Sequence, residues 1–231
     1  MVKIKIFADG ADIQEMQKMS LIPQVRGWTT NPSLMHKAGV TNYKLFTHKV
    51  IHAFPQYPLS LEVFADEFDE MEKQAHEIAS WGFNIFVKIP VCNTKGVSAA
   101  PLIGRLTAAG VKVNVTAVMC AAQVDDVCDT LGLPPAIISI FAGRIADTGR
   151  NPAGAISHAL RVRKRPHHEI LWASPRQVLD VYTAEALGCD VITCSPEIIK
   201  KLPLEGKNLK EYSRLTVKMF YDDAKAAGYS L

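Results

Sequence analysis

The sequence predicts an α/β fold in which eight strand–helix units close into a single (β/α)8 (TIM) barrel. Eight short runs rich in β-branched residues recur along the chain, and each is followed by a stretch of helical character. Several helical stretches end at a glycine just before the next strand, as parallel βα units commonly do. The length of 231 residues also suits one barrel, because barrels of this kind reach this size without dividing.

The strands are predicted from runs of β-branched and aliphatic residues, taken here in chain order. We expect them at residues 4–8, 25–29, 59–63, 85–89, 111–117, 137–142, 170–173 and 190–193. No linker, internal repeat or low-complexity tract separates any of them. Residues 1–231 are therefore expected to form one TIM-barrel domain.

The helices are justified by apolar residues at helical spacing. We expect them at 66–80, 101–109 and 177–187, with extra helices at 43–53 and 209–227. Acidic residues in the first turn of 66–80 complement the helix dipole. The first three are expected to end at Gly82, Gly110 and Gly188, where a residue with positive φ is favoured.

The last helix, at about 208–227, has an apolar side. This side carries Leu209, Tyr212, Leu215, Met219 and Phe220. It could pack over its own barrel or reach a neighbouring subunit. The second alternative predicts a homo-oligomer, ring-shaped in one arrangement.

Composition limits the partners and the compartment. The formal charge of +3 with 21% charged residues is too weak an imbalance to indicate nucleic acid or a membrane surface, and it leaves small anionic substrates open. The basic run at 161–165 closes an expected helix, where cations complement the dipole. Five scattered cysteines without a Cys-x-x-Cys pair indicate thiols in a reducing compartment. With no signal peptide or membrane-spanning run, we expect a cytoplasmic protein.

Lys88 is the most unusual residue of the sequence. In its strand, Ile85, Val87 and Ile89 point to one side, and Phe86 and Lys88 point to the other. Desolvation inside an apolar strand disfavours the charged form and favours a neutral amine that can condense with a carbonyl. The alternative is a lysine whose ammonium reaches water at the strand end.

Further polar residues share this inward side at the carboxyl ends of strands, where active sites of barrels lie. These are Ser60 and Glu62 on the third strand, Asn114 and Thr116 on the fifth, Asp9 at the end of the first, and Asn31 after the second. Each also has a structural explanation. Asp9 and Asn31 could cap helices, the fifth-strand pair could satisfy backbone groups, and Glu62 could form a purely structural ion pair with Lys88.

A second group follows strands six and seven. Ser139, Arg144, Ser174 and Arg176 supply two hydroxyls and two guanidiniums, a composition suited to a phosphate. The sequence lacks the glycine patterns of nucleotide-binding loops, so side chains would hold the phosphate.

Metal and cofactor sites are not expected. The seven histidines lie mainly in helical or loop stretches. His48 and His52 share a helix face, but no third ligand accompanies them, which favours an ordinary surface pair.

The residues resemble the transaldolase family, especially its short single-barrel members, which include fructose 6-phosphate aldolases. The resemblance rests on Asp9, Thr29-Thr30-Asn31-Pro32-Ser33-Leu34, Glu62, Val87-Lys88-Ile89-Pro90, Asn114-Val115-Thr116, Phe141-Ala142-Gly143-Arg144-Ile145 and Ala173-Ser174-Pro175-Arg176. It implies that Lys88 forms a Schiff base with a sugar phosphate and that the enzyme serves carbohydrate metabolism of the pentose phosphate kind. Within the family, Glu62 and Phe141 resemble transaldolases, whereas the aldolases tend to have glutamine and tyrosine there.

The resemblance also suggests roles. Glu62 with Thr116 would activate a water and Asp9 would take the proton of the C4 hydroxyl. Substrate would be bound by Thr29, Asn31, Asn114, Phe141, Ser139, Arg144, Ser174 and Arg176. Two alternatives stay open: aldol cleavage that releases dihydroxyacetone, and a non-catalytic barrel that only binds sugar phosphates. Cys92, the loop 93–96 and Pro175 depart from the family pattern, which affects the expected substrate preference.

Overall fold

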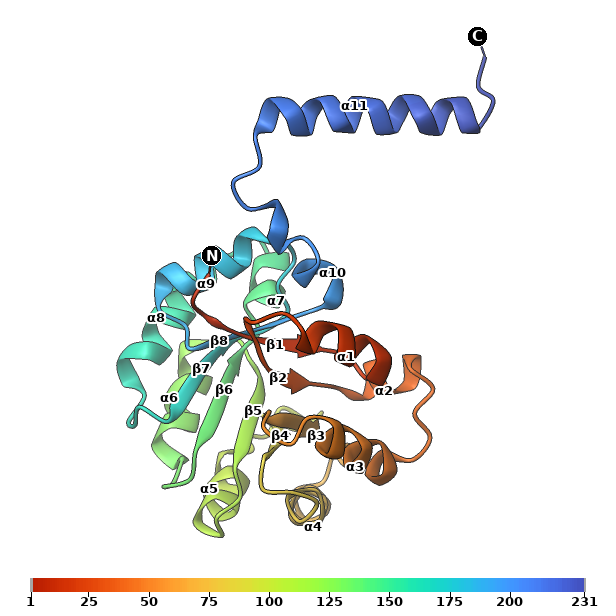
Figure 1. The fold of residues 1–231 in the computed structure, drawn as a ribbon. Coiled ribbons are helices and arrows are strands. Elements are labelled where there is room, and N and C mark those ends of the chain that lie inside the picture. Colours follow the sequence, from red (N-terminus) through yellow and green to blue (C-terminus); the bar gives the residue numbers. More distant parts are fainter. Residues whose placement is uncertain (1, 231) are drawn as a thin grey trace.

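Eight parallel strands close into a barrel, in sequence order, in the computed structural model, which describes residues 2–230 (Figure 1). The strands are β1 (Lys5–Asp9), β2 (Val25–Thr29), β3 (Leu59–Glu62), β4 (Ile85–Pro90), β5 (Val113–Val118), β6 (Ala136–Ile140), β7 (His168–Trp172) and β8 (Val191–Cys194). β1 pairs with both β2 and β8, which closes the ring. The predicted TIM barrel is confirmed.

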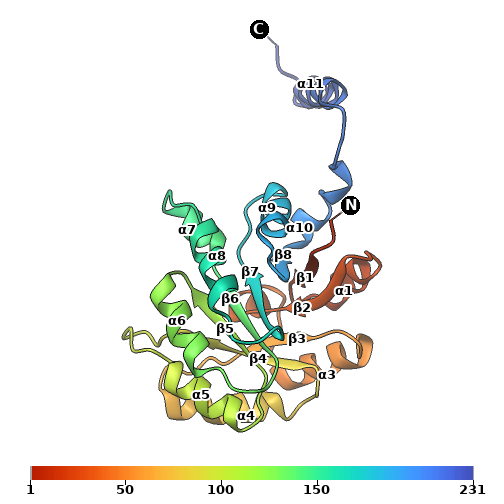
Figure 2. The same cartoon turned by 90° about the vertical axis from the view of Figure 1, so that its left-hand side faces the viewer.

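Helices surround the strands on the outside of the barrel (Figures 1 and 2). They are α1 (Ile13–Ser20), α2 (Pro32–Lys37), α3 (Tyr43–Ala53), α4 (Phe68–Ala79), α5 (Ala100–Ala108), α6 (Ala121–Thr130), α7 (Ala142–Asp147), α8 (Ala153–Val162), α9 (Leu179–Leu187), α10 (Pro196–Ile199), the short 3₁₀ helix η1 (Leu202–Leu204) and α11 (Leu209–Ala226). The predicted extra helix at 43–53 is confirmed as α3.

The two sides of each strand form two separate cores. Phe7, Ile137, Leu171 and Val191 pack together inside the barrel, with Phe86 against them. The opposite sides of the strands pack against the helices, as do Ile85, Val87 and Ile89 of β4. The predicted alternation along β4 is therefore confirmed, and it places Lys88 on the barrel interior.

Two of the three predicted helix-ending glycines have the expected backbone. Gly110 and Gly188 have φ of +85° and +86°. Gly82 does not, because α4 already ends at Ser80 in a right-handed conformation. An added Cβ at Gly82 would lie 2.8 Å from Ile51 Cδ1, the end of a side chain that can move aside. The prediction for this glycine was wrong because the helix ends two residues earlier, in a conformation that needs no glycine.

The sixth strand is shorter than predicted. β6 ends at Ile140, and Ala142, which the sequence analysis assigned to the strand, begins α7. Phe141 turns the chain between them, with φ −78° and ψ +61°. This turn places Arg144 beside the barrel opening.

α11 extends away from the barrel and does not fold back on it (Figures 1 and 2). None of its residues is buried. The alternative in which this helix packs over its own barrel is therefore not observed. None of the described helices combines the length and the apolar content that a bilayer-spanning helix needs.

Candidate active site

A cavity of about 390 Å³ opens at the carboxyl ends of the strands. It is lined by Asp9, Thr29, Asn31, Pro32, Ser33, Glu62, Lys88, Asn114, Thr116, Ser139, Phe141, Arg144, Ala173, Ser174 and Thr193. All the predicted site residues are among them except Arg176. The predicted residues of β1 to β6 therefore converge on one pocket, together with Asn31 after β2, Phe141 and Arg144 after β6, and Ser174 after β7.

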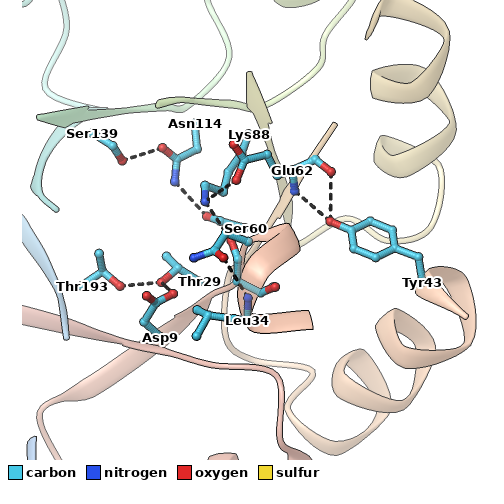
Figure 3. Close-up of polar contacts among 12 residues, drawn as sticks. Asp9, Thr29, Leu34, Tyr43, Ser60, Glu62, Lys88, Asn114, Ser139 and Thr193 are labelled. Atoms are coloured by element: carbon cyan, nitrogen blue, oxygen red, sulfur yellow. Dashed lines mark hydrogen bonds and ion pairs between the residues drawn. The ribbon is translucent and has the colours of Figure 1, made fainter. Parts of the chain in front are cut away.

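Lys88 is buried, with 8% of its surface exposed. Its Nζ lies 2.9 Å from Glu62 Oε2 and donates a second hydrogen bond, of 2.8 Å, to the Thr30 carbonyl oxygen (Figure 3). Glu62 and Lys88 are paired residues of β3 and β4, so the strand register itself brings the carboxylate to the amine. A lysine that reaches bulk water is excluded by this geometry. The carboxylate both stabilises the ammonium and stands where it can accept its proton.

A chain of neutral hydrogen bonds crosses the floor of the cavity next to Lys88. Asn114, the β5 partner of Lys88 in register, donates from Nδ2 to Ser60 Oγ at 3.0 Å. Its Oδ1 accepts from Ser139 Oγ at 2.7 Å (Figure 3). Ser139 thus lies within β6 and is bound to Asn114, whereas Arg144 lies on α7 and Arg176 follows β7. These bonds fix the orientation of the Asn114 amide.

Asp9 and Thr29 occupy the other side of the cavity. Thr29 Oγ1 donates to Asp9 Oδ1 at 2.9 Å and is itself in contact with the hydroxyl of Thr193 (Figure 3). Burial raises the pKa of Asp9 above its ordinary value, and the charge of Lys88 and the Thr29 hydrogen bond oppose this rise only in part. Asp9 caps no helix, because Asp12 is the N-cap of α1. A carboxyl with a raised pKa beside a buried lysine is a suitable group for proton transfer.

Asn31 caps a helix, which is one of the alternatives that the sequence left open, and it also lies at the cavity. Its Oδ1 accepts from the Leu34 amide at 2.9 Å and caps α2, while the residue also lines the cavity. Thr116, aligned with Pro90 of β4, lines the cavity as well. Within the part of the chain that the structure describes, its hydroxyl forms no direct bond to Glu62.

The two arginines differ. Arg144, on α7, is exposed and lines the cavity without a hydrogen bond or ion pair to any described residue. Arg176 forms an ion pair with Asp147, with Nε 3.1 Å from Oδ1, and this pairing lowers the pKa of Asp147. Ser174, two residues before Arg176, lines the cavity and has a left-handed conformation, with φ +58°. The structure therefore brings Arg144 and Ser174 to the cavity and leaves Arg176 beside it.

Several contributors were absent from the predicted site, among them Thr193, the Thr30 carbonyl and the Tyr43 hydroxyl. Thr193 continues the inward side of β8 and could have been found by the same alternation that identified Glu62. The Thr30 carbonyl and the Tyr43 hydroxyl, which bonds to the backbone of Glu62, give no signal in the sequence.

Histidines take no part in the cavity. His48 and His52 are exposed on α3. Among residues 2–230, no group of three or more His, Cys, Asp or Glu side chains is arranged to hold a metal ion.

Comparisons with solved structures describe the fold. A 3-hexulose-6-phosphate synthase from Salmonella typhimurium superimposes with a TM-score of 0.59 at 16% identity, over 83% of this chain and 89% of that one. A structure described as native KDPGal has a TM-score of 0.53 at 10% identity, over 99% and 98%. At such identities the similarity concerns the barrel alone.

Sequence comparisons show the family. The model of the Transaldolase/Fructose-6-phosphate aldolase family matches residues 6–231. A probable transaldolase of Myxococcus xanthus is 33% identical over 215 residues, which are 90% of this chain and 92% of that protein. A probable transaldolase of Brucella ovis is 35% identical over 214 residues, 90% and 94% of the two chains. The chain therefore belongs to the transaldolase/fructose-6-phosphate aldolase family and is an enzyme of the transaldolase kind.

Proposed function

We propose that the enzyme transfers a dihydroxyacetone unit from a ketose phosphate to an aldose phosphate, through a Schiff base on Lys88. The observation that carries this proposal is the buried amine 2.9 Å from a carboxylate oxygen, in a cavity that also holds Asp9. A barrel that only bound sugar phosphates would gain nothing from a desolvated lysine at its centre.

The first step joins substrate to enzyme. Lys88 gives a proton to Glu62, and the free amine attacks the C2 ketone of the donor to form a carbinolamine. Loss of water then gives an iminium, which can accept an electron pair. Glu62 and Thr116 both line the cavity, and we assign to them the placement of the water that carries protons in this step.

The second step breaks the C3–C4 bond. Asp9 takes the proton of the C4 hydroxyl, C4 becomes the aldehyde carbon of the departing aldose phosphate, and the bonding pair passes to the iminium to give an enamine. The raised pKa of Asp9 makes it a stronger base than an ordinary aspartate. Asn31 and Asn114 offer amide groups for the hydroxyls of the bound three-carbon unit.

Transfer reverses these events on the acceptor. The enamine adds to the aldehyde of an incoming aldose phosphate, Asp9 returns its proton, and water releases the new ketose phosphate from Lys88. Arg144 and Ser174 line the cavity and would meet the phosphate first. Arg176 would join them by exchanging Asp147 for the phosphate.

Transfer is favoured over simple cleavage by two residues that line the cavity. Glu62 and Phe141 resemble the transaldolase pattern in place of glutamine and tyrosine. The requirement for an acceptor aldose separates the two reactions.

Borohydride trapping tests the covalent step. The enzyme is mixed with fructose 6-phosphate and reduced, and the labelled peptide is mapped by mass spectrometry. We expect one three- or six-carbon adduct on Lys88 and none in Lys88→Ala. Label on another residue, or none, would overturn the Schiff-base assignment.

We further propose that residues 1–231 act as one domain and that the enzyme is a cytoplasmic homo-oligomer. All eight strands lie between Lys5 and Cys194, which supports one barrel. The five cysteines are free thiols, which fits a reducing compartment. α11 leaves Leu209, Val217 and Phe220 exposed by 79%, 65% and 62%, and a second copy of the chain is the partner that would cover them.

A further inference from the structure

The hydroxyl of Tyr43 is bonded to the backbone of a proposed catalytic residue. It donates to the Glu62 carbonyl oxygen at 3.0 Å and accepts from the Glu62 amide at 2.9 Å (Figure 3). Its ring is held edge-on by Phe64 and Trp81, with centroids 5.4 and 5.8 Å away. A side chain of α3 therefore satisfies both backbone groups of the last residue of β3.

The Glu62 amide and carbonyl are the backbone groups that would otherwise form hydrogen bonds with β2. The Trp28 amide donates to Pro58 and the Thr30 amide donates to Ser60, at 2.9 and 3.2 Å. In a parallel ladder the next bond would run from the Glu62 amide to the Thr30 carbonyl. The bond after that would need an N–H at position 32, which is Pro32 and has none.

The β2–β3 hydrogen bonding therefore ends one bond early, and the Tyr43 hydroxyl replaces β2 as the partner of Glu62. As a result, the Thr30 carbonyl is not used by β3 and instead accepts from Lys88 Nζ at 2.8 Å. We propose that Tyr43 is a positioning residue of this enzyme, which keeps the top of the β2–β3 seam open so that the Thr30 carbonyl and the Glu62 carboxylate together orient the Lys88 amine. This inference rests on the proposed Schiff-base function.

The chemistry of the phenol suits this task. Burial raises the pKa of Tyr43, so its hydroxyl stays protonated at any working pH and can always donate to the Glu62 carbonyl. A phenol is also both donor and acceptor, as the two groups of Glu62 require.

Removal of the Tyr43 hydroxyl should change the hydrogen-bond partner of the Glu62 amide. In Tyr43→Phe the ring keeps its contacts, but the Glu62 amide loses its acceptor, and the next acceptor in the ladder is the Thr30 carbonyl. The amide and Lys88 Nζ would then compete for one oxygen. The expected defect is therefore in amine attack, and the binding of substrate should be little changed.

The experiment compares rates of Schiff-base formation with saturating fructose 6-phosphate, by timed borohydride quench, in Tyr43→Phe and two controls. Tyr57→Phe removes a hydroxyl before β3, at the opposite end of the strand, from a ring that packs on Trp28. Phe64→Leu weakens the packing around Tyr43 but keeps its hydroxyl. Melting curves establish that each variant is folded at the assay temperature.

We expect Tyr43→Phe to form the adduct about tenfold more slowly, the effect of one lost positioning hydrogen bond, with an unchanged KM for the donor. The controls should stay within about twofold of the wild type. A wild-type rate in Tyr43→Phe, or an equal loss in Phe64→Leu that follows its melting temperature, would overturn this inference alone. Absence of a Lys88 adduct in the wild type would overturn the proposed function as well.

Discussion

Lys88 and Glu62 face each other from paired positions of β4 and β3, with Nζ 2.9 Å from Oε2. The substitution Glu62→Gln keeps the shape and a hydrogen-bond acceptor but removes the base. Because positioned proton transfer contributes about 10² to 10⁴ in rate, we expect a loss of this size in adduct formation at Lys88 and in turnover. Timed borohydride trapping and steady-state kinetics measure the two quantities.

The matched control is Glu67→Gln, which breaks the exposed Lys95–Glu67 ion pair. It should change activity by less than about twofold, since exposed ion pairs contribute little. If Glu62→Gln formed the adduct at the wild-type rate, the pair with Lys88 would be only structural.

Asp9→Asn should separate the two chemical steps. The Schiff base should still form on Lys88, whereas C3–C4 cleavage should slow by about 10² to 10⁴ because the base for the C4 hydroxyl is lost. Since burial raises the pKa of Asp9 above the ordinary value of 3.8, wild-type activity should fall on acidification at a higher pH than an unperturbed aspartate would give. Equal losses in trapping and cleavage would argue against this division of roles.

The same substitution should stabilise the fold near neutral pH. A carboxyl whose pKa is raised on folding binds its proton more tightly in the folded state. Its contribution to stability is therefore lost as the pH rises from the ordinary pKa through the raised pKa of the folded state, and above that pH the buried charge destabilises the fold. Asp9→Asn removes this destabilising charge. Melting temperatures should therefore be higher than in the wild type at pH 7, and the difference should shrink toward pH 4.

Arg144→Met should weaken phosphate binding more than Arg176→Met does. Arg144 lines the cavity, whereas Arg176 is already paired with Asp147. We expect the KM for a phosphorylated acceptor to rise about 10- to 100-fold in Arg144→Met, the effect of a lost charged hydrogen bond, with little change for a free sugar. Equal effects on phosphorylated and free acceptors would remove the phosphate assignment.

Gly143→Ala should damage the fold around the arginines. An added Cβ at Gly143 would overlap the Ser174 carbonyl oxygen, and backbone cannot move aside as a flexible side chain can. We expect a loss of at least about 1 to 3 kcal/mol in the free energy of unfolding, measured in urea. Gly154→Ala is the control, because no atom lies within 4 Å of its added Cβ.

Truncation after Lys207 should lower the subunit count. This change removes α11, which contributes no buried residue to its own barrel. Light scattering should give a smaller particle than the full chain, with far-UV circular dichroism still that of a folded barrel. Phe220→Asp should weaken assembly and Lys225→Ala should not; an unchanged mass after truncation would contradict the oligomer proposal.

The barrel and most of the site follow from a simple pattern. Alternation along β3, β4 and β5 identifies Glu62, Lys88 and Asn114 as inward residues, and the parallel barrel then brings their strand ends together. Because a period of two is set by backbone geometry, it can be recognised without tertiary information.

Other features depend on distant partners. The sequence predicts the same role for Arg144 and Arg176, but in the structure Arg144 lines the cavity and Arg176 is paired with Asp147. The role of Tyr43 depends on where α3 lies against β3. These relationships are tertiary and local sequence does not encode them in a readable form.

Glu62, Lys88 and Asn114 are aligned in register on three neighbouring strands, so the geometry of the reaction centre depends on the number of residues in each of these strands. One residue inserted or deleted within β4 would turn the lysine toward the helices and bring Val87 or Ile89 to the carboxylate. Changes in the length of the loops that connect helices and strands would leave the register of Glu62, Lys88 and Asn114 unchanged. An insertion or deletion in a loop or at a helix end should therefore be tolerated better than one within β3, β4 or β5.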